Sequence, residues 1–202
     1  MHIDIQTDHF HIRTVLPSDK DAYMSLRIKT SDVEKAYDLF PDFLEYTWEK
    51  VLKNKDEISM MVFQKEDNAF VAICNFQDFQ DDHVEIGYDV KSEYRGKGIG
   101  TKLVIDLVAL AHTTFPGKEV ITRIRDENRA SCRVAEKAGG ILIRREPTPE
   151  AKLIADVLEK YSVGKLDKLG FSASEDQIMT WEKEKEDGKD KIRVYRMPCV
   201  RK

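Results

Sequence analysis

The residues that most clearly suggest chemistry lie in the segment "EYRGKGIGTKLV", residues 93–104. Three glycines stand at alternate positions with Arg95, Lys97 and Lys102 among them, and an apolar pattern of helical period follows directly. Glycine lets the backbone bend tightly and approach a ligand. The first N–H groups of a helix carry partial positive charge and bind anions. The segment therefore predicts an anion-binding loop; the simpler alternative is an ordinary glycine-rich turn with incidental basic residues.

The spacing of the glycines excludes two phosphate-binding loops. A P-loop requires GxxxxGK[ST], but here the order is Gly-Thr-Lys. A dinucleotide fingerprint requires GxGxxG after a first parallel strand, whereas this segment reads GxGxG after strands expected to be antiparallel. A third pattern, [RQ]xxGxG[AG], is met by Arg95, Gly98 and Gly100, with Thr101 in the last place. In such a loop, successive N–H groups converge on phosphate oxygens.

The elements that must position this loop follow from hydrophobic periodicity. Strand-like segments separated by turn residues precede it: "ISMMVFQKE", "NAFVAICNFQDF" and "DHVEIGYDV". A helix from Gly98 to "TTFPG" follows, and then "KEVITRIRD" as a strand, "NRASCRVAEKAG" as a helix, and "GILIRRE" and "KIRVYRMPCV" as strands. Upstream, "FHIRTVLP" predicts a strand, Ser18 or Asp19 caps a helix, and Pro41 interrupts a further helical stretch.

This order of elements predicts an α/β (α+β) fold. We expect one mixed, mostly antiparallel sheet as a single layer, with helices on both of its faces. The 202 residues are enough for one domain with a substantial core, so we expect a single domain over 1–202. A helix-rich, highly charged insertion at about 147–190 precedes the last strand.

Several of these motifs together resemble one family. "IGYDVKSEYRGKGIGTKLV" resembles the acetyl-CoA motif of the GNAT superfamily of N-acyltransferases, and "NRASCRVAEKAG" resembles its second signature. "FHIRTVLPSDKDAYMSL" is similar to the opening strand and helix of the ribosomal-protein-alanine N-acetyltransferase-like branch. The resemblance covers roughly residues 10–146 and the last strand, with its motifs in the family's order. It implies the GNAT-like fold and acetyl-CoA as cosubstrate.

The resemblance also implies a set of cofactor-binding residues. In the family, a kink splays one strand from its neighbour, and the pantetheine arm of acetyl-CoA lies in the gap. Backbone groups of Tyr88, Asp89 and Val90 would then pair with pantetheine, and Asn128 and Ser131 would line the other wall. The pyrophosphate would bind to the amides of the loop, namely those of Arg95, Gly96, Lys97, Gly98, Ile99, Gly100 and Thr101.

The chemistry implied by the resemblance is direct attack of an amine on the thioester in a ternary complex. An alkyl ammonium with a pKa of about 10.4 must first lose a proton, so a general base helps. Glu85 stands where many family members carry a catalytic glutamate; the alternative is a solvated cross-strand carboxylate, and a water chain is left open as the base. His83 and Asp89 are neighbours that could substitute, although a solvated role suits both better. Strand alternation places Glu85 on one face with Gly87 and Asp89.

The sequence departs from the family pattern at two positions near the second signature, and Cys132 lies between the signature asparagine and the first of them. Many relatives have a tyrosine seven residues after the signature asparagine as general acid, but here that residue is Ala135. Ser131 or water is then expected to protonate the thiolate. Cys132 suggests an acyl-cysteine, but no histidine lies near it in sequence and cysteine is usually buried, so we expect a core residue. Gly140 replaces the usual aromatic residue.

Composition restricts the class of protein. The net charge of -4 argues against broad nucleic-acid binding, and no apolar run approaches the ~20 residues that span a bilayer. The N-terminus has no signal-peptide pattern, and Cys74, Cys132 and Cys199 lack the spacing of a disulfide framework or zinc site. We expect a cytoplasmic protein without a metal ion or membrane partner.

The acceptor is left open at this stage. The leading hypothesis is an N-acetyltransferase acting on a primary amine of a small molecule or a protein N-terminus. The alternatives are a catalytically weak CoA-binding sensor of the same fold and nucleotide binding by the loop. The insertion contains two predicted helical stretches, Glu150–Tyr161 and Asp176–Glu186. These helices could cover the acceptor pocket, form a homodimer contact, or pack on the surface without a role in specificity. An apolar stripe on the first of them must pack somewhere: Leu153, Ile154, Val157, Leu158 and Tyr161.

Overall fold

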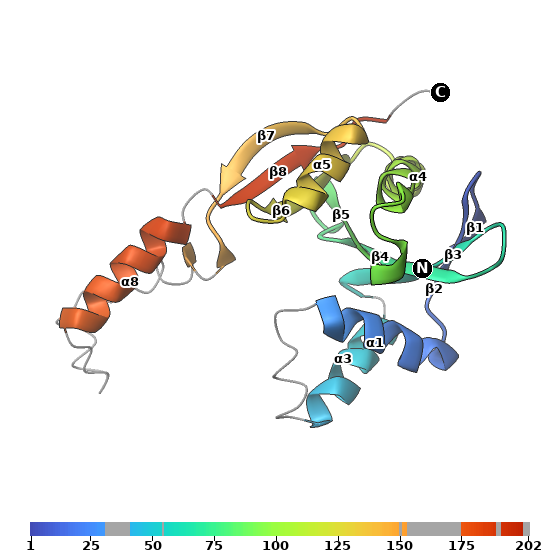
Figure 1. The fold of residues 1–202 in the computed structure, drawn as a ribbon, viewed down its shortest axis with the longest axis horizontal. Helices are drawn as coiled ribbons and strands as arrows, with labels where there is room; N and C mark the ends of the chain where they lie inside the picture. The colour runs from blue at the N-terminus through green and yellow to red at the C-terminus, as the bar shows by residue number, and fades with distance from the viewer. Residues whose placement is uncertain (31–40, 54, 150, 153–174, 189–190, 200–202) are drawn as a thin grey trace. The chain divides into compact units, whose positions relative to one another are not determined.

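The computed structural model describes the chain except residues 31–40, 54, 150, 153–174, 189–190 and 200–202 (Figure 1). The strands are β1 (Asp4–Gln6), β2 (Phe10–Thr14), β3 (Glu57–Gln64), β4 (Phe70–Gln77), β5 (His83–Val90), β6 (Glu119–Arg125), β7 (Ile141–Glu146) and β8 (Ile192–Arg196). The helices are η1 (Pro17–Asp19), α1 (Lys20–Thr30), α3 (Pro41–Lys53), η2 (Ser92–Tyr94), α4 (Ile99–Thr114), α5 (Arg129–Lys137) and α8 (Glu175–Gly188).

The eight strands form one sheet in the order β1-β2-β3-β4-β5-β6-β8-β7. Pairs from β1 to β5 are antiparallel, and β5 pairs with β6 in parallel. The predicted mixed, mostly antiparallel sheet is confirmed. Strand β1 is an addition that the sequence did not predict. Its three residues are too few to show an alternating pattern, and it pairs with β2 through Ile5 and Ile12.

The chain divides into two compact units. The first comprises Met1–Thr122, Val134–Ile141 and Arg196–Lys202, and the second comprises Arg123–Arg133 and Leu142–Tyr195. In the first unit, α1 and α3 pack on one face of the sheet (Figure 1). Their core contains Tyr23, Met24 and Leu26 of α1, Trp48 and Val51 of α3, and Met61 and Ile73 of the sheet.

Helix α4 packs against β5 on the other face of the sheet. Its buried residues recur at helical spacing, as the sequence predicts: Leu103, Val104, Leu107, Val108 and Ala111. The helix ends at Thr114, directly before Phe115 and Pro116. The apolar residues of β5 at alternate positions, Val84 and Ile86, are buried at 0% and 1% exposure. Strand alternation therefore separates an α4 face from a face covered by α1 and α3.

Asp19, one of the two residues predicted to cap the helix, is the last residue of η1 and lies directly before α1. Its carboxylate accepts a hydrogen bond from the Leu16 backbone N–H at 2.7 Å. It also accepts two hydrogen bonds from the Arg13 guanidinium, at 2.6 Å and 2.9 Å. The bidentate pair ties β2 to the turn that leads into the helix.

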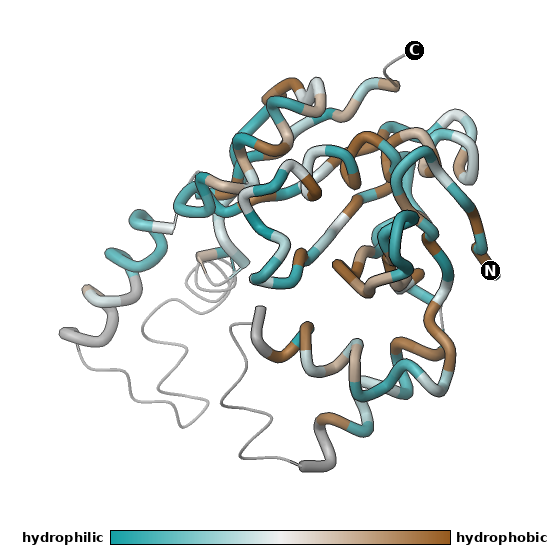
Figure 2. Tube along the Cα trace, turned by 45° about the vertical axis from the view of Figure 1, so that its right-hand side comes forward, coloured by the Kyte–Doolittle hydropathy of each residue, from teal (hydrophilic) through white to brown (hydrophobic). Residues whose placement is uncertain are grey.

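The second unit is rich in charged residues. Asp126 pairs with Arg193 and Arg145, and Glu146 accepts hydrogen bonds from Arg123 and Arg144. Helix α8 carries the predicted helix at Asp176–Glu186, and its described residues are mainly hydrophilic (Figure 2). The predicted stretch Glu150–Tyr161 and its stripe, Leu153, Ile154, Val157, Leu158 and Tyr161, lie almost entirely outside the described residues. Among the helices that the structure describes, none is long and apolar enough to cross a bilayer.

Candidate active site

Glu85 lies in β5 with its side chain buried, at 7% exposure. It is opposite Gln77 of β4 and beside Ile121 of β6. In the same register, Gly87 is opposite Asn75, and Asp89 is opposite Ile73 of the α1/α3 core. Alternation therefore puts Glu85 on the face that α1 and α3 cover. An exposure of 7% does not fit the alternative of a solvated surface carboxylate.

A polar network lies on the same face, two strands away from Glu85. The Glu57 carboxylate accepts hydrogen bonds from Asn75 Nδ2 at 2.7 Å, Ser59 Oγ at 3.0 Å and Arg27 Nη1 at 3.3 Å. Arg27 also donates to Tyr23 Oη at 3.2 Å. Burial alone would lower the pKa of the Arg27 guanidinium, but the nearby Tyr23 and Glu57 raise it above its usual value. The guanidinium and the carboxylate therefore hold each other in place.

Sequence reasoning missed this network, although a signal was present. Glu57 and Ser59 alternate along β3, and Asn75 and Gln77 alternate along β4; apart from Gln64 at the end of β3, the other residues of both strands are apolar. Polar residues at such positions must find partners when a helix covers them. Register makes them neighbours: Glu57 is opposite Gln77, and Ser59 is opposite Asn75. Two rows of residues that lie opposite one another across β3, β4 and β5 thus form the polar end of this face: Glu57–Gln77–Glu85 and Ser59–Asn75–Gly87.

Gly87 is required by the position of Asn75. A Cβ added at residue 87 would lie 2.3 Å from Asn75 Oδ1. Real Cβ atoms do not approach other heavy atoms so closely, so any side chain here would displace the amide. The missing side chain of Gly87 leaves the space in which Asn75 reaches Glu57.

The ladder between β5 and β6 is short. Parallel pairing covers His83 with Glu119, Val84 with Val120, and Glu85 with Ile121, where it ends. Strand β5 nevertheless runs on to Val90, still paired with β4. Glu85 therefore stands at the last pair of the ladder, five residues before the end of its strand.

The glycine loop joins β5 to α4 within the first unit. Gly96 and Gly98 have φ values of +74° and +81°, in the left-handed region that favours glycine. Gly98 caps α4, and the first helical hydrogen bond runs from the Lys102 N–H to the Gly98 carbonyl at 3.2 Å. The N–H groups of Ile99, Gly100 and Thr101 fall in the first turn, where a helix leaves donors available. The predicted helix start is confirmed.

Side chains of the loop and of β5 hold this arrangement together. Arg95 Nε donates to the Val90 carbonyl at 2.8 Å, which ties the loop to the end of the strand. A Cβ on Gly100 would lie 3.6 Å from the Tyr88 ring and 3.5 Å from Val134 Cγ2, so α4 starts close to both. Lys97 is exposed, with its ammonium 5.7 Å from the centre of the Tyr94 ring. Asp89 is partly buried on the opposite face from Tyr88.

Asn128 and Ser131 belong to the second unit, at the start of α5. The Asn128 Oδ1 accepts a hydrogen bond from the Ser131 backbone N–H at 3.1 Å, so Asn128 caps the helix. The Cys132 N–H donates to the Asn128 carbonyl at 3.1 Å in the first helical turn. The signature asparagine therefore has a structural role in this chain, in addition to any contact with a ligand.

The two departures from the family pattern, Ala135 and Gly140, and the neighbouring Cys132 are buried or tightly packed positions. Cys132 is 3% exposed and Ala135 is 2% exposed, so the expectation of a core cysteine is confirmed. A Cβ on Gly140 would lie 2.8 Å from the Ala135 carbonyl oxygen and 2.8 Å from Met197 Sδ. An aromatic side chain at residue 140 has no room in this arrangement. Among the described residues, no group of histidine, cysteine and carboxylate side chains could hold a metal ion.

Comparison with known proteins identifies the family and the fold. Residues 7–141 match the family described as "Acetyltransferase (GNAT) domain". A search of curated protein sequences finds no match. Spermidine N-acetyltransferase from Vibrio cholerae, solved with CoA and spermine, has a similar fold, with a TM-score of 0.60, 14% identity and 95% of each chain covered.

Two further solved structures are similar in fold. A GNAT-family acetyltransferase from Bacillus anthracis has a TM-score of 0.55 at 22% identity and covers 71% of this chain and 87% of its own. A domain from Methanocaldococcus jannaschii DSM 2661 has a TM-score of 0.51 at 21% identity and covers 68% of this chain and 92% of its own. The family match spans most of the chain and includes β5, the loop and α4. The chain belongs to the GNAT family of acetyltransferases.

Proposed function

We propose that the protein transfers an acetyl group from acetyl-CoA to a primary amine, with Glu85 as general base. The observation that carries this proposal is the position of Glu85. It is a buried carboxylate at the last pair of the β5–β6 ladder, on the same strand that leads into the glycine loop. A base and a phosphate-binding loop joined by one strand suit a reaction between a bound thioester and an amine.

The residues of the first unit fit coenzyme A. The left-handed Gly96 and Gly98 let the backbone turn at the start of α4, and the loop amides from Arg95 to Thr101 are the proposed pyrophosphate ligands. Beyond Glu85, β5 is no longer paired with β6, which supports backbone pairing of Tyr88, Asp89 and Val90 with the pantetheine arm. In the second unit, Asn128 and Ser131 are the proposed contacts nearer the thioester.

Bound acetyl-CoA supplies the acetyl group as a thioester, a carbonyl that an amine can attack without prior activation. Glu85 accepts a proton from the acceptor ammonium, directly or through a water. The neutral nitrogen then forms a bond to the carbonyl carbon as the C–S bond breaks. The nitrogen then has one more proton than the amide product, and the Ser131 hydroxyl or a water relays this proton to the departing thiolate, so that CoA leaves as the thiol and the serine is unchanged; a thiol with a pKa of about 8.5 needs only weak assistance. Burial of Cys132 favours this direct route over an acyl-cysteine.

The acceptor is a primary amine of a small molecule or a protein N-terminus. The fold shared with a spermidine N-acetyltransferase supports a small-molecule amine, although an identity of 14% does not transfer its substrate. The sequence resemblance to the ribosomal-protein-alanine branch supports an α-amine. We further propose that 1–202 is one acetyltransferase domain that carries the insertion at about 147–190.

A thiol-release assay tests the activity. Purified protein is mixed with acetyl-CoA and a panel of polyamines, peptides and aminated antibiotics, and free CoA is followed with a chromogenic disulfide. Amine-dependent release supports the proposal, and mass spectrometry of the product identifies the N-acetyl amide. Tight CoA binding without release for any amine supports the CoA-binding sensor. Equal affinity for ATP and CoA in competition would contradict both.

A further inference from the structure

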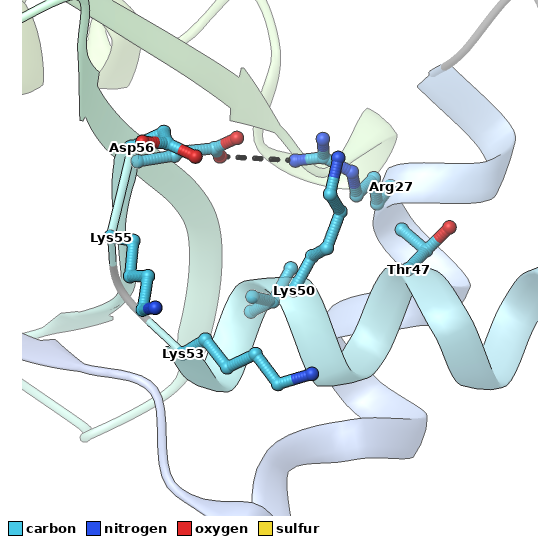
Figure 3. A pocket seen from close by; sticks show the side chains of 8 residues that line it. Arg27, Thr47, Lys50, Lys53, Lys55 and Asp56 are labelled. Carbon is cyan, nitrogen blue, oxygen red and sulfur yellow. Dashed lines mark hydrogen bonds and ion pairs between the residues drawn. The ribbon is translucent and has the colours of Figure 1, made fainter.

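A pocket of about 290 Å³ lies between α1, α3 and the start of β3, within the first unit (Figure 3). The charged side chains around it are Arg27, Lys50, Lys53, Lys55, Asp56 and Glu57. Four are cationic and two are acidic, whereas the whole chain has a net charge of -4. The positive charge is therefore a local feature of this pocket and does not follow from the composition of the protein.

One of the two carboxylates, Glu57, is already paired with one of the four cations, Arg27. Glu57 is committed to Arg27 at 3.3 Å and to the Ser59 and Asn75 donors in the sheet. Arg27 in turn is fixed from two sides, by Glu57 and by Tyr23 Oη. With the Arg27–Glu57 pair set aside, the charged residues that line the pocket are one carboxylate, Asp56, and three lysines.

The lysines come from a short stretch at the end of α3 and the connection to β3. Lys50 extends from α3 toward the side of the pocket where Arg27 lies, and Lys53 and Lys55 line the same pocket (Figure 3). Lys53 also pairs with Glu49, but both side chains are more than 60% exposed, so this pair contributes little to the local charge balance. An excess of positive charge around one pocket favours a bound anion and repels a cation, even though the three ammonium groups point in different directions in Figure 3.

We propose that this pocket binds an anionic group of the acceptor, a carboxylate or a phosphate, and so selects a zwitterionic amine over a polyamine. The inference rests on the proposed N-acetyltransferase activity for the amine; the binding of an anion does not depend on it. Glu57, at the edge of the pocket, lies in the same sheet row as Glu85, two strands away. At about 4.8 Å per strand, their backbones are on the order of 10 Å apart.

This separation, taken as the approximate distance from Glu85 to the edge of the pocket, sets the length of the test compound. Triglycine spans about 10 Å from amine to carboxylate when extended, at up to 3.6 Å per residue. Its amide has the same primary amine and no anion, so the pair isolates the contribution of the carboxylate. Spermidine is the polycationic comparison. A carboxylate held by the lysines is expected to favour triglycine over triglycinamide by about tenfold in kcat/KM, or ~1.4 kcal/mol.

The variant is Lys50→Ala/Lys55→Ala, which removes two exposed cations without uncovering Glu57. Arg27→Ala is unsuitable, because it would leave the Glu57 carboxylate without its guanidinium partner. Lys185→Ala, an exposed lysine of α8, is the matched control. Circular dichroism and the unfolding midpoint confirm that each variant is folded.

Binding is measured first, without acetyl-CoA, by titrating inorganic phosphate and glutarate at low ionic strength, where exposed charges are least screened. Wild type and Lys185→Ala are expected to bind at least one of them, and the double variant at least tenfold more weakly. Stronger binding of glutarate indicates a carboxylate ligand; stronger binding of phosphate indicates a phosphate. Equal binding by wild type and the double variant would overturn the proposal.

Kinetics then separates the two levels of the proposal. The preference for triglycine should fall to about one in the double variant and persist in Lys185→Ala. Equal kcat/KM for triglycine and triglycinamide in wild type, or a preference for spermidine, would overturn the acceptor assignment while leaving acetyl transfer intact. Lysine-dependent anion binding without acetylation of any amine would support the pocket and reject the proposed activity.

Discussion

Gly87→Ala tests whether the polar face beside Glu85 is built as described. The added Cβ would stand 2.3 Å from Asn75 Oδ1, whereas ordinary contacts are at least 3.4 Å. The Asn75 side chain must therefore move by about 1 Å, which breaks its 2.7 Å hydrogen bond to Glu57. A hydrogen bond to a charged group contributes about 1.5–3 kcal/mol, so Gly87→Ala should lower the free energy of unfolding by that amount.

A double-mutant cycle supplies the control. Asn75→Ala removes the obstructing amide, and Gly87→Ala in that background should be neutral or stabilising by about 0.5 kcal/mol, because alanine loses less backbone entropy than glycine. Free energies are measured by urea denaturation, with coincident fluorescence and circular dichroism transitions as the test of two-state behaviour. The expected coupling is about 2 kcal/mol. Strictly additive costs would refute the steric argument.

Three other outcomes follow from single positions. Gly98→Ala should weaken CoA binding and lower the free energy of unfolding by about 1–2 kcal/mol, because φ is +81° at residue 98. Calorimetry measures the binding and denaturation measures the stability. Gly100→Ala is the milder comparison, since a Cβ there would have no contact shorter than 3.5 Å. The hydrogen bond from Arg13 lowers the pKa of the Asp19 carboxyl, so this pair should stabilise the protein above about pH 4 and lose its effect as pH falls through the lowered pKa. The gap in unfolding free energy between wild type and Asp19→Asn should shrink from pH 5 to pH 2, and a constant gap would contradict the assignment. Iodoacetamide should label exposed Cys199 in the native protein and spare buried Cys132, as peptide mass spectrometry can check.

The sequence was sufficient for the elements that have strong periodic or turn signals. Helix α4 repeats apolar residues at helical spacing between Gly98 and Phe115, and β3 to β5 are short runs rich in apolar residues that are separated by turns of polar residues. Alternation also predicted that Glu85, Gly87 and Asp89 share a face, and the register agrees. Local rules determined these features, so no long-range information was needed.

The features that depend on pairing between distant strands were not predicted, because polar residues inside β3 and β4 indicate that partners are needed but not which residues supply them. Burial of Glu85 requires β4 and β6 on both sides, and the second of these begins 34 residues later in the chain at Glu119. The hydrogen bonds from Arg27 and Asn75 to Glu57 join residues 30 and 18 positions apart. These residues become neighbours only through strand pairing and helix packing in the folded protein, since in the sequence each polar residue resembles an ordinary surface residue.

The most direct test of the account is the turnover of Glu85→Gln. Glutamine matches glutamate in size but cannot accept a proton, so the buried position should remain filled while the base is lost. With the best acceptor from the thiol-release assay, kcat should fall about 10²–10⁴-fold, and the Kd for CoA measured by calorimetry should stay within about twofold. An unchanged kcat would show that Glu85 is not the base and would contradict the central claim.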